Sequence, residues 1–279
     1  MSATPASLLR DARQHLDGRE ADWLLMHVTG VSGAQLRGAA EEPLDAATAT
    51  AFRGLVAKRR SGIPLAYLIG TQPFRALELT VDERVLIPRP ETEELVEHTL
   101  ALAPAGTPVS VVDLGTGSGA IALSLASERP AWTVTAVDAS TDALAVARAN
   151  ADRLGLHVDW HQGEWFAPLG GRRFDLIVSN PPYVAVGDPE LDAAVAAHEP
   201  AGALLAGPDG LDAIRRIAAA APTYLIPGGW LLLEHGHRQG QGTRALLTEA
   251  GFSAVDTLRD QHGRDRFTRG CLQGSDADG

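Results

Sequence analysis

Four consecutive residues form the part of this sequence best suited to chemistry. They are Asn180, Pro181, Pro182 and Tyr183. The asparagine supplies a side-chain carbonyl and the first proline a backbone carbonyl, while the two prolines restrict φ and stiffen the segment. Two acceptors fixed in this way can orient a planar amide or amine nitrogen, whose delocalised lone pair makes it a poor nucleophile. Such positioning can lower a barrier by about 7–11 kcal/mol, so no strong base is required.

An ordinary turn is the competing interpretation, because Asn-Pro and Pro-Pro are turn formers. The position of the segment argues against it. The segment follows apolar residues 174–179, which predict a strand, and ligands bind at the carboxyl ends of strands in a parallel sheet. We therefore predict that Asn180, Pro181 and Tyr183 are catalytic, with the tyrosine ring lying against the planar substrate group.

A glycine-rich loop lies earlier in the chain. Gly115, Thr116, Gly117, Ser118 and Gly119 join a predicted strand to a predicted helix. The glycines permit a tight turn and a close approach of the backbone to a ligand, because no Cβ intervenes. Their spacing also satisfies the dinucleotide pattern with alanine last, so the loop alone is compatible with NAD or with S-adenosyl-L-methionine (AdoMet).

Two carboxylates favour AdoMet over NAD. Asp113 lies two residues before the first glycine and could face the ligand's ammonium group. Asp138 ends the next predicted strand, where a carboxylate can accept both ribose hydroxyls, although a helix cap or a surface acid is the alternative. The predicted cofactor-binding set in this region is Asp113, Gly115, Thr116, Gly117, Gly119 and Asp138.

The residues around these motifs alternate between predicted strands and helices. The strands cover 109–114, 133–138, 157–161, 174–179, 229–234, 253–260 and 266–271. The helices cover 91–102, 120–127, 141–154, 211–221 and 239–250. Alternation with short connections predicts an α/β fold with a mainly parallel, doubly wound sheet.

The first part of the chain predicts a small helical bundle. Thr4-Pro5 can start a helix, and Asp45 can cap a longer helix that ends near residue 60. Nothing in this region has catalytic spacing, so we expect the bundle to contact a partner. Apolar residues at 77–81 and 85–87 predict a hairpin that connects the bundle to the α/β region.

Composition excludes several classes of protein. The 24 basic and 35 acidic residues give a net charge of −11, which disfavours a general nucleic-acid binder. The lone Cys271 excludes a disulfide framework and a Cys-rich zinc site. His235 and His237 have metal-like spacing without a completing cluster, so no metal is expected. Because no apolar run approaches the ~18 residues of a membrane helix, we expect a soluble cytoplasmic protein without a membrane partner.

Taken together, these motifs identify the chain as similar to the release factor glutamine methyltransferase family of class I AdoMet-dependent enzymes. The resemblance covers most of the chain. It rests on the stretches Gly70–Phe74, Leu86–Glu93, Asp113–Leu123, Val178–Tyr183, His198–Pro200 and Leu231–Gly236.

The resemblance implies a fold, a reaction and a substrate. The fold is a Rossmann-like methyltransferase domain preceded by the helical bundle. The reaction moves a methyl group from AdoMet to the glutamine amide of the Gly-Gly-Gln motif in class I peptide chain release factors, leaving S-adenosyl-L-homocysteine and modulating translation termination. Glu164 would reach the adenine, where aspartate is usual in the family, and the next residue, Trp165, would also bind the cofactor, although plain core is the alternative for it. Arg89, Thr92 and Glu93 match a stretch that walls the pocket, with no catalytic step assigned.

The resemblance also implies roles for whole segments. Residues 1–72 would recognise the substrate, 73–90 would form the connecting hairpin, and 91–279 would carry the methyltransferase domain. In the tetrapeptide, Asn180 and Pro181 would grip the glutamine amide, Pro182 and Tyr183 would contact the substrate, and Asn180 would also contact the cofactor. We expect a monomer that binds release factors and no nucleic acid directly.

Three alternatives remain open at this point. A DNA adenine methyltransferase shares the Asn-Pro-Pro-Tyr motif but needs a basic groove and a base-flipping pocket. A sister family methylates a glutamine of a ribosomal protein and tends to carry Ser-Pro in the stretch where this chain has Pro90-Glu91-Thr92-Glu93. A noncatalytic protein that binds AdoMet or NAD is the third.

Overall fold

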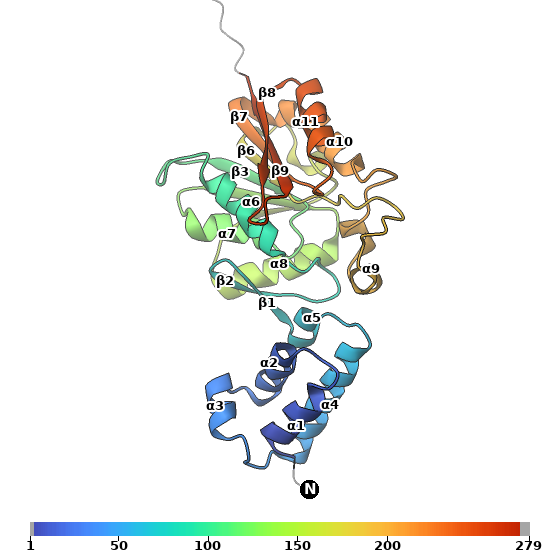
Figure 1. Ribbon diagram of the computed structural model, residues 1–279. Coiled ribbons are helices and arrows are strands. Elements are labelled where there is room, and N and C mark those ends of the chain that lie inside the picture. The colour runs from blue at the N-terminus through green and yellow to red at the C-terminus, as the bar shows by residue number, and fades with distance from the viewer. Residues whose placement is uncertain (1–2, 274–279) are drawn as a thin grey trace, which may run out of the picture. The chain divides into compact units, whose positions relative to one another are not determined.

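The computed structural model describes residues 3–273, and contacts within the chain divide them into two units. The first unit contains residues 3–71 together with Asp192–His198. The second contains Gln72–Leu191 and residues 199–273. Figure 1 labels most of the helices and strands of both.

The first unit is helical, as its sequence predicts. Its helices are α1 (Pro5–Ala12), α2 (Gly18–Thr29), α3 (Gly33–Gly38), α4 (Ala46–Arg60), α5 (Leu65–Ile69) and α9 (Ala193–His198). Thr4 and Asp45 cap α1 and α4 by accepting hydrogen bonds from backbone N–H groups three residues on. Leu8, Leu24 and Phe52 are almost fully buried in the core between the helices. The short helix α5 was not predicted, because it follows the helix-ending segment at 61–64.

The predicted hairpin is wrong in its pairing. The two-stranded sheet joins β1 (Thr71–Phe74) to β2 (Leu77–Thr80). The strand predicted at 77–81 therefore pairs with the preceding residues 71–74 and not with residues 85–87, which follow it. Arg75 lies in the left-handed region at φ 51° and makes the tight turn between the strands. The apolar residues Val85 and Ile87 are buried without forming a strand, and the backbone N–H of Ile87 donates to a carboxylate instead.

The second unit contains a seven-stranded sheet in the order β5-β4-β3-β6-β7-β9-β8. Its strands are β3 (Ser110–Leu114), β4 (Thr133–Asp138), β5 (Asp159–Gln162), β6 (Phe174–Ser179), β7 (Leu225–Glu234), β8 (Phe252–Arg259) and β9 (Asp265–Leu272). Strands β5, β4, β3, β6 and β7 are parallel neighbours, whereas β9 runs antiparallel to both β7 and β8. The sheet is therefore mainly parallel, as predicted.

Helices cover both faces of this sheet (Figure 1). They are α6 (Pro90–Leu100), α7 (Ala120–Glu128), α8 (Thr141–Leu154), α10 (Asp212–Tyr224) and α11 (Gly240–Glu249). Alternate residues of β3 enter different cores. Val111 packs in the core that includes α6 and α7, and Val112 in the core that includes α10 and α11. This alternation is the reason why the strands appear as continuous apolar runs in the sequence.

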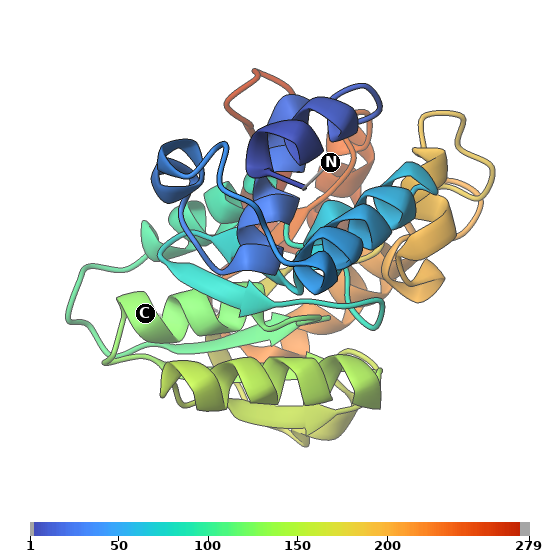
Figure 2. The same cartoon turned by 90° about the horizontal axis from the view of Figure 1, so that it is seen from below.

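Asn150 on α8 links the end of β2 to the glycine loop. Its Nδ2 donates to the carbonyls of Thr80 and Ser118, and its Oδ1 accepts from the N–H of Thr80. The residue is fully buried on α8, which contacts β2, β4 and β5 (Figure 2). The parallel topology then brings the carboxyl ends of β3, β4, β6 and β7 to one edge of the sheet, where the motif residues lie.

Candidate active site

The glycine loop leaves β3 in a conformation that requires glycine. Gly115, Gly117 and Gly119 have φ values of 73°, 56° and 85°, in the left-handed region. A Cβ at Gly119 would lie 2.9 Å from a side-chain atom of Leu123, so a larger residue there would displace that side chain and strain the backbone. The N–H groups of Gly115 and Thr116 both donate to the carbonyl of Val137, which anchors the loop to β4.

Asp113 lies beneath this loop rather than in the wall of a pocket. It is fully buried, and its Oδ2 accepts a 2.6 Å hydrogen bond from the hydroxyl of Thr116. Its Oδ1 has no hydrogen-bond partner among the described residues. Burial raises the pKa of Asp113 to about 7, because the charged form loses its hydration. The structure thus shows Asp113 holding the loop, and its predicted contact with an ammonium group remains a prediction.

Asp138 lies at the carboxyl end of β4 and supports the loop from the other side. Its Oδ2 accepts from the N–H of Gly117 at 2.8 Å and its Oδ1 from the N–H of Ser140 at 2.9 Å. Burial raises the pKa of this carboxyl, and the two backbone N–H groups oppose that shift. Each oxygen keeps a further lone pair, so the carboxylate can accept additional hydroxyl donors.

A pocket of about 470 Å³ opens beside the loop. This volume lies within the range of small-molecule sites. The predicted cofactor residues in its lining are Gly115, Gly117, Asp138, Glu164 and Trp165. Pro182, which was predicted to bind the substrate, also lines it. Thr116, Gly119, Asn180, Pro181 and Tyr183 are outside that lining.

The pocket has the character that AdoMet requires. Trp165 provides an apolar wall, and its indole Nε1 is buried without a hydrogen-bond partner within the described chain. Asp138 offers carboxylate oxygens for hydroxyl groups. Glu164 forms an ion pair with Arg216 at the surface, and about 61% of its side chain is exposed. These residues fit a ligand that combines a planar apolar part with hydroxyl donors.

Asn180 lies at the end of β6 and is tied to two other elements. Its Nδ2 donates to the hydroxyl oxygen of Thr92 on α6 at 3.0 Å. That hydroxyl donates to Oε2 of Glu234, at the end of β7, at 2.8 Å. The hydroxyl of Tyr183 makes a longer contact of 3.4 Å to Oε1 of the same carboxylate. Three segments distant in sequence, α6, the end of β7 and the tetrapeptide, therefore meet at one buried carboxylate.

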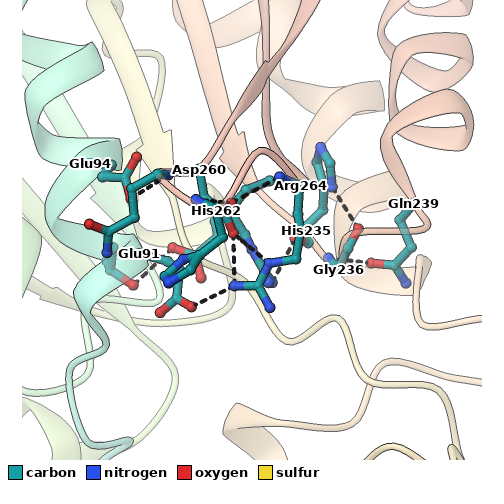
Figure 3. Close-up of polar contacts among 12 residues, drawn as sticks. Glu91, Glu94, His235, Gly236, Gln239, Asp260, His262 and Arg264 are labelled. Atoms are coloured by element: carbon teal, nitrogen blue, oxygen red, sulfur yellow. Dashed lines mark hydrogen bonds and ion pairs between the residues drawn. The ribbon is translucent and has the colours of Figure 1, made fainter.

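The segment after Asn180 is held in place by side chains from other parts of the sequence. Gln239 donates from Nε2 to the carbonyl of Tyr183 at 2.9 Å and accepts at Oε1 from the N–H of Gly236 at 2.8 Å (Figure 3). Glu199, only 5% exposed, pairs with Arg89 and accepts from the N–H of Ile87. These contacts restrict the loop that carries the tetrapeptide.

The start of α6 is fixed by the turn between β8 and β9. Figure 3 shows Arg264 between Asp260 and Glu91, and Nη2 of Arg264 lies 2.9 Å and 3.2 Å from oxygens of these two carboxylates. The N–H of Gln261 donates to Glu94 at 3.2 Å. This network holds the helix turn on which Thr92 is located.

Sequence reasoning missed the roles of Thr92, Glu234 and Gln239. Glu234 did carry a signal, because a carboxylate ends an otherwise apolar run. His235, by contrast, is a structural residue. Its Nε2 lies 2.8 Å from the hydroxyl of Thr268, and burial lowers its pKa to about 4. Within residues 3–273, no three His, Cys, Asp or Glu side chains lie together as metal ligands would, and no helix is long and apolar enough to cross a membrane.

Comparisons with known proteins agree with this geometry. The family model of the methyltransferase small domain matches residues 92–210, and that of the PrmC N-terminal domain matches residues 5–70. The release factor glutamine methyltransferase of Xylella fastidiosa strain Temecula1 is 48% identical over 97% of this chain and 99% of its own length. That of Pseudomonas aeruginosa is 50% identical over 78% of this chain and 79% of its own.

Solved structures share the fold. A methyltransferase from Pyrococcus furiosus matches with a TM-score of 0.57 and 19% identity, over 78% of this chain and 100% of that one. A 16S rRNA N2 G1207 methyltransferase of T. thermophilus, solved with AdoMet and guanosine, matches with a TM-score of 0.53 and 21% identity, over 73% of this chain and 50% of that one.

The contacts of Asp138 lead to a prediction about ligand binding. Asp138→Asn places an NH2 group against the N–H of Gly117 or Ser140 and removes one ribose acceptor. We expect AdoMet affinity, measured by titration calorimetry, to fall by about 10- to 100-fold, the range for hydrogen bonds to a charged group. Asp152→Asn, an exposed change on α8, is the matched control. Equal affinities of the two variants would contradict the assignment.

Proposed function

We infer that this chain, which belongs to the release factor glutamine methyltransferase family, transfers a methyl group from AdoMet to a glutamine side-chain amide nitrogen of release factors. Relatives of that description match nearly its whole length. The observation that carries the residue assignment is the hydrogen bond from Asn180 Nδ2 to Thr92, because it leaves the asparagine carbonyl available. We propose that the target is the glutamine of the Gly-Gly-Gln motif of class I release factors.

The chain's own residues have three tasks in this reaction. When bound, AdoMet supplies a methyl group on a positively charged sulfur. The glycine loop and Asp138 hold that molecule, while Trp165 and Glu164 line its pocket. Asn180 Oδ1 and the carbonyl of Pro181 accept the two N–H groups of the glutamine amide and aim its nitrogen at the methyl carbon.

Electrostatics then favour the transfer. As the N–C bond forms and the C–S bond breaks, positive charge moves from sulfur to nitrogen. The two carbonyl oxygens stabilise that charge on the nitrogen because they are already oriented toward it. The surplus proton leaves the nitrogen for solvent, so the chain needs no strong base. The face of Tyr183 lies against the planar amide in this proposal.

Other methyl acceptors fit this chain less well. A ribosomal-protein glutamine has the same chemistry, but the relatives named above are release factor enzymes. Adenine in DNA requires a basic surface, whereas this chain carries a net charge of −11. The proposed site of action is the cytoplasm, where release factors serve the ribosome. We propose that the protein is a monomer, since nothing in the sequence indicates an interface repeat.

We further propose that residues 1–72 recognise the release factor and that residues 91–279 carry out the transfer. Residues 73–90 connect these two parts. A groove of about 880 Å³ in the first unit supports this division. Trp23, about 49% exposed, contributes apolar surface to the groove. Its charged lining residues are Arg10, Arg13, Arg19, Arg37 and Asp22. The excess of arginine in the groove suits an acidic segment of the substrate. The exposed ring of Trp23 suits an apolar side chain in that segment.

The role of Asn180 can be tested directly. Asn180→Ala removes the side-chain acceptor, and we expect kcat on an intact class I release factor to fall by about 100- to 1,000-fold, as for loss of one preorganised group in an active site. Because Asn180 is outside the lining of the cofactor pocket, its predicted cofactor contact is a minor one, and AdoMet affinity, measured by calorimetry on the same samples, should stay near the wild-type value. Parallel loss of rate and of AdoMet affinity would contradict the role given to Asn180.

The groove can be tested by changing its charge and its aromatic anchor. In a Trp23→Ala, Arg37→Glu double variant, we expect the KM for an intact release factor to rise about tenfold or more, because exposed Trp and Arg often dominate interfaces. The KM for AdoMet should not change. Arg53→Glu, an exposed change on α4 outside this groove, is the control. An unchanged KM for the release factor in the double variant would refute the assignment.

A further inference from the structure

A chain of three polar side chains connects the catalytic asparagine to the protein interior. Glu234 is 1% exposed and Thr92 is 4% exposed. The hydroxyl of Thr92 lies 2.8 Å from Glu234 Oε2 and 3.0 Å from Asn180 Nδ2. The three residues come from β7, α6 and the end of β6, so only the folded chain assembles them.

The number of protons shared by Glu234, Thr92 and Asn180 determines how the amide of Asn180 is oriented. A threonine hydroxyl has one proton, and an ionised carboxylate can only accept hydrogen bonds. The proton of Thr92 therefore points to Glu234, and its oxygen can only accept from Asn180. Asn180 must then present its NH2 group to Thr92, which leaves Oδ1 free for another donor.

We propose that Thr92 and ionised Glu234 are positioning residues that hold the amide of Asn180 with its carbonyl directed to the substrate. This inference rests on the proposed function, in which Oδ1 accepts an N–H of the target glutamine. An asparagine amide is nearly symmetric in shape, so packing alone selects poorly between its two orientations. The hydrogen bonds that Thr92 donates to Glu234 and accepts from Asn180 supply that selection.

Protonation of Glu234 would reverse the donor-to-acceptor direction of the hydrogen bonds between Glu234, Thr92 and Asn180. A neutral carboxyl can donate to the oxygen of Thr92, whose own proton is then free to point to Asn180. The amide can turn and offer Oδ1 to that proton, so the acceptor needed by the substrate is occupied. The ionised form of Glu234 thus corresponds to the active arrangement.

The surroundings of Glu234 place this change near neutral pH. Burial raises its pKa to about 7, and Glu91 on α6 acts in the same direction. The hydroxyls of Thr92 and Tyr183 and the charge of Arg266 on β9 oppose that shift. His235, the next residue, is held neutral by burial. Because the active form is the ionised one, kcat should rise as the pH increases through about 7.

A matched pair of buried threonines on α6 makes the proposal testable. Thr92→Val keeps the shape of the side chain and removes the hydroxyl. Thr99→Val makes the same change at a fully buried residue whose hydroxyl donates only to the carbonyl of Leu95 within the helix. Thr92→Ser restores the hydroxyl. Glu234→Gln removes the ionisable group and leaves a side chain that can both donate and accept.

The experiment measures kcat, KM and AdoMet affinity of the full chain with an intact class I release factor. We expect Thr92→Val to lower kcat by about 10- to 100-fold, as for a slightly misplaced catalytic group, with AdoMet affinity unchanged. Thr92→Ser should recover most of the rate, and Thr99→Val should match the wild type. The wild type should lose activity below about pH 7, and Glu234→Gln should lack this pH dependence.

A binding measurement separates orientation from chemistry. With S-adenosyl-L-homocysteine at saturation, a Gly-Gly-Gln peptide should bind more weakly to Thr92→Val than to Thr99→Val. Equal kcat and equal peptide affinity of these two variants would overturn the inference. A Glu234→Gln variant whose kcat still falls at acidic pH as that of the wild type does would also overturn it. Failure of the wild type to methylate the release factor would instead overturn the proposed function.

Discussion

The weak nucleophilicity of an amide nitrogen is the constraint on which the rest of this structure depends. Its lone pair is delocalised into the carbonyl, so the protein must orient the nitrogen rather than remove its proton first. Fixed acceptors are therefore needed at a place where the methyl donor also binds. The parallel sheet meets this need, because the carboxyl ends of β3, β4, β6 and β7 meet at one edge. The glycine loop, Asp138, Asn180 and Glu234 lie at these ends.

Rigidity at this edge comes from buried polar contacts between elements. Ser179 donates to the carbonyl of Leu114 and ties β6 to β3 beside the glycine loop. Gln239 holds the carbonyl of Tyr183, and Glu199 binds the segment after β2 through the side chain of Arg89 and the N–H of Ile87. Each contact satisfies groups that would be costly to bury alone. The same contacts limit the positions that the tetrapeptide can adopt, so stability and orientation have a common origin.

Local patterns were enough to predict most of the fold and part of the candidate site. The predicted bounds of β4, β6 and α8 match the structure because these elements are apolar or amphipathic runs with clear ends. The return strand predicted at 85–87 was wrong, because an apolar run can also be a buried extended segment. The glycine loop and the tetrapeptide are contiguous and could be recognised. Thr92 lies 88 residues from Asn180 and 142 from Glu234, so no local pattern could reveal their contact.

The most direct test of the account is to locate the methyl group that the enzyme adds. An intact class I release factor, a ribosomal protein and DNA would each be incubated with the chain and AdoMet, and the products analysed by tandem mass spectrometry. The account predicts one added methyl group on the side-chain amide of the Gly-Gly-Gln glutamine, and none with Asn180→Ala. Methylation of adenine or of the ribosomal protein, with an unmodified release factor, would contradict it.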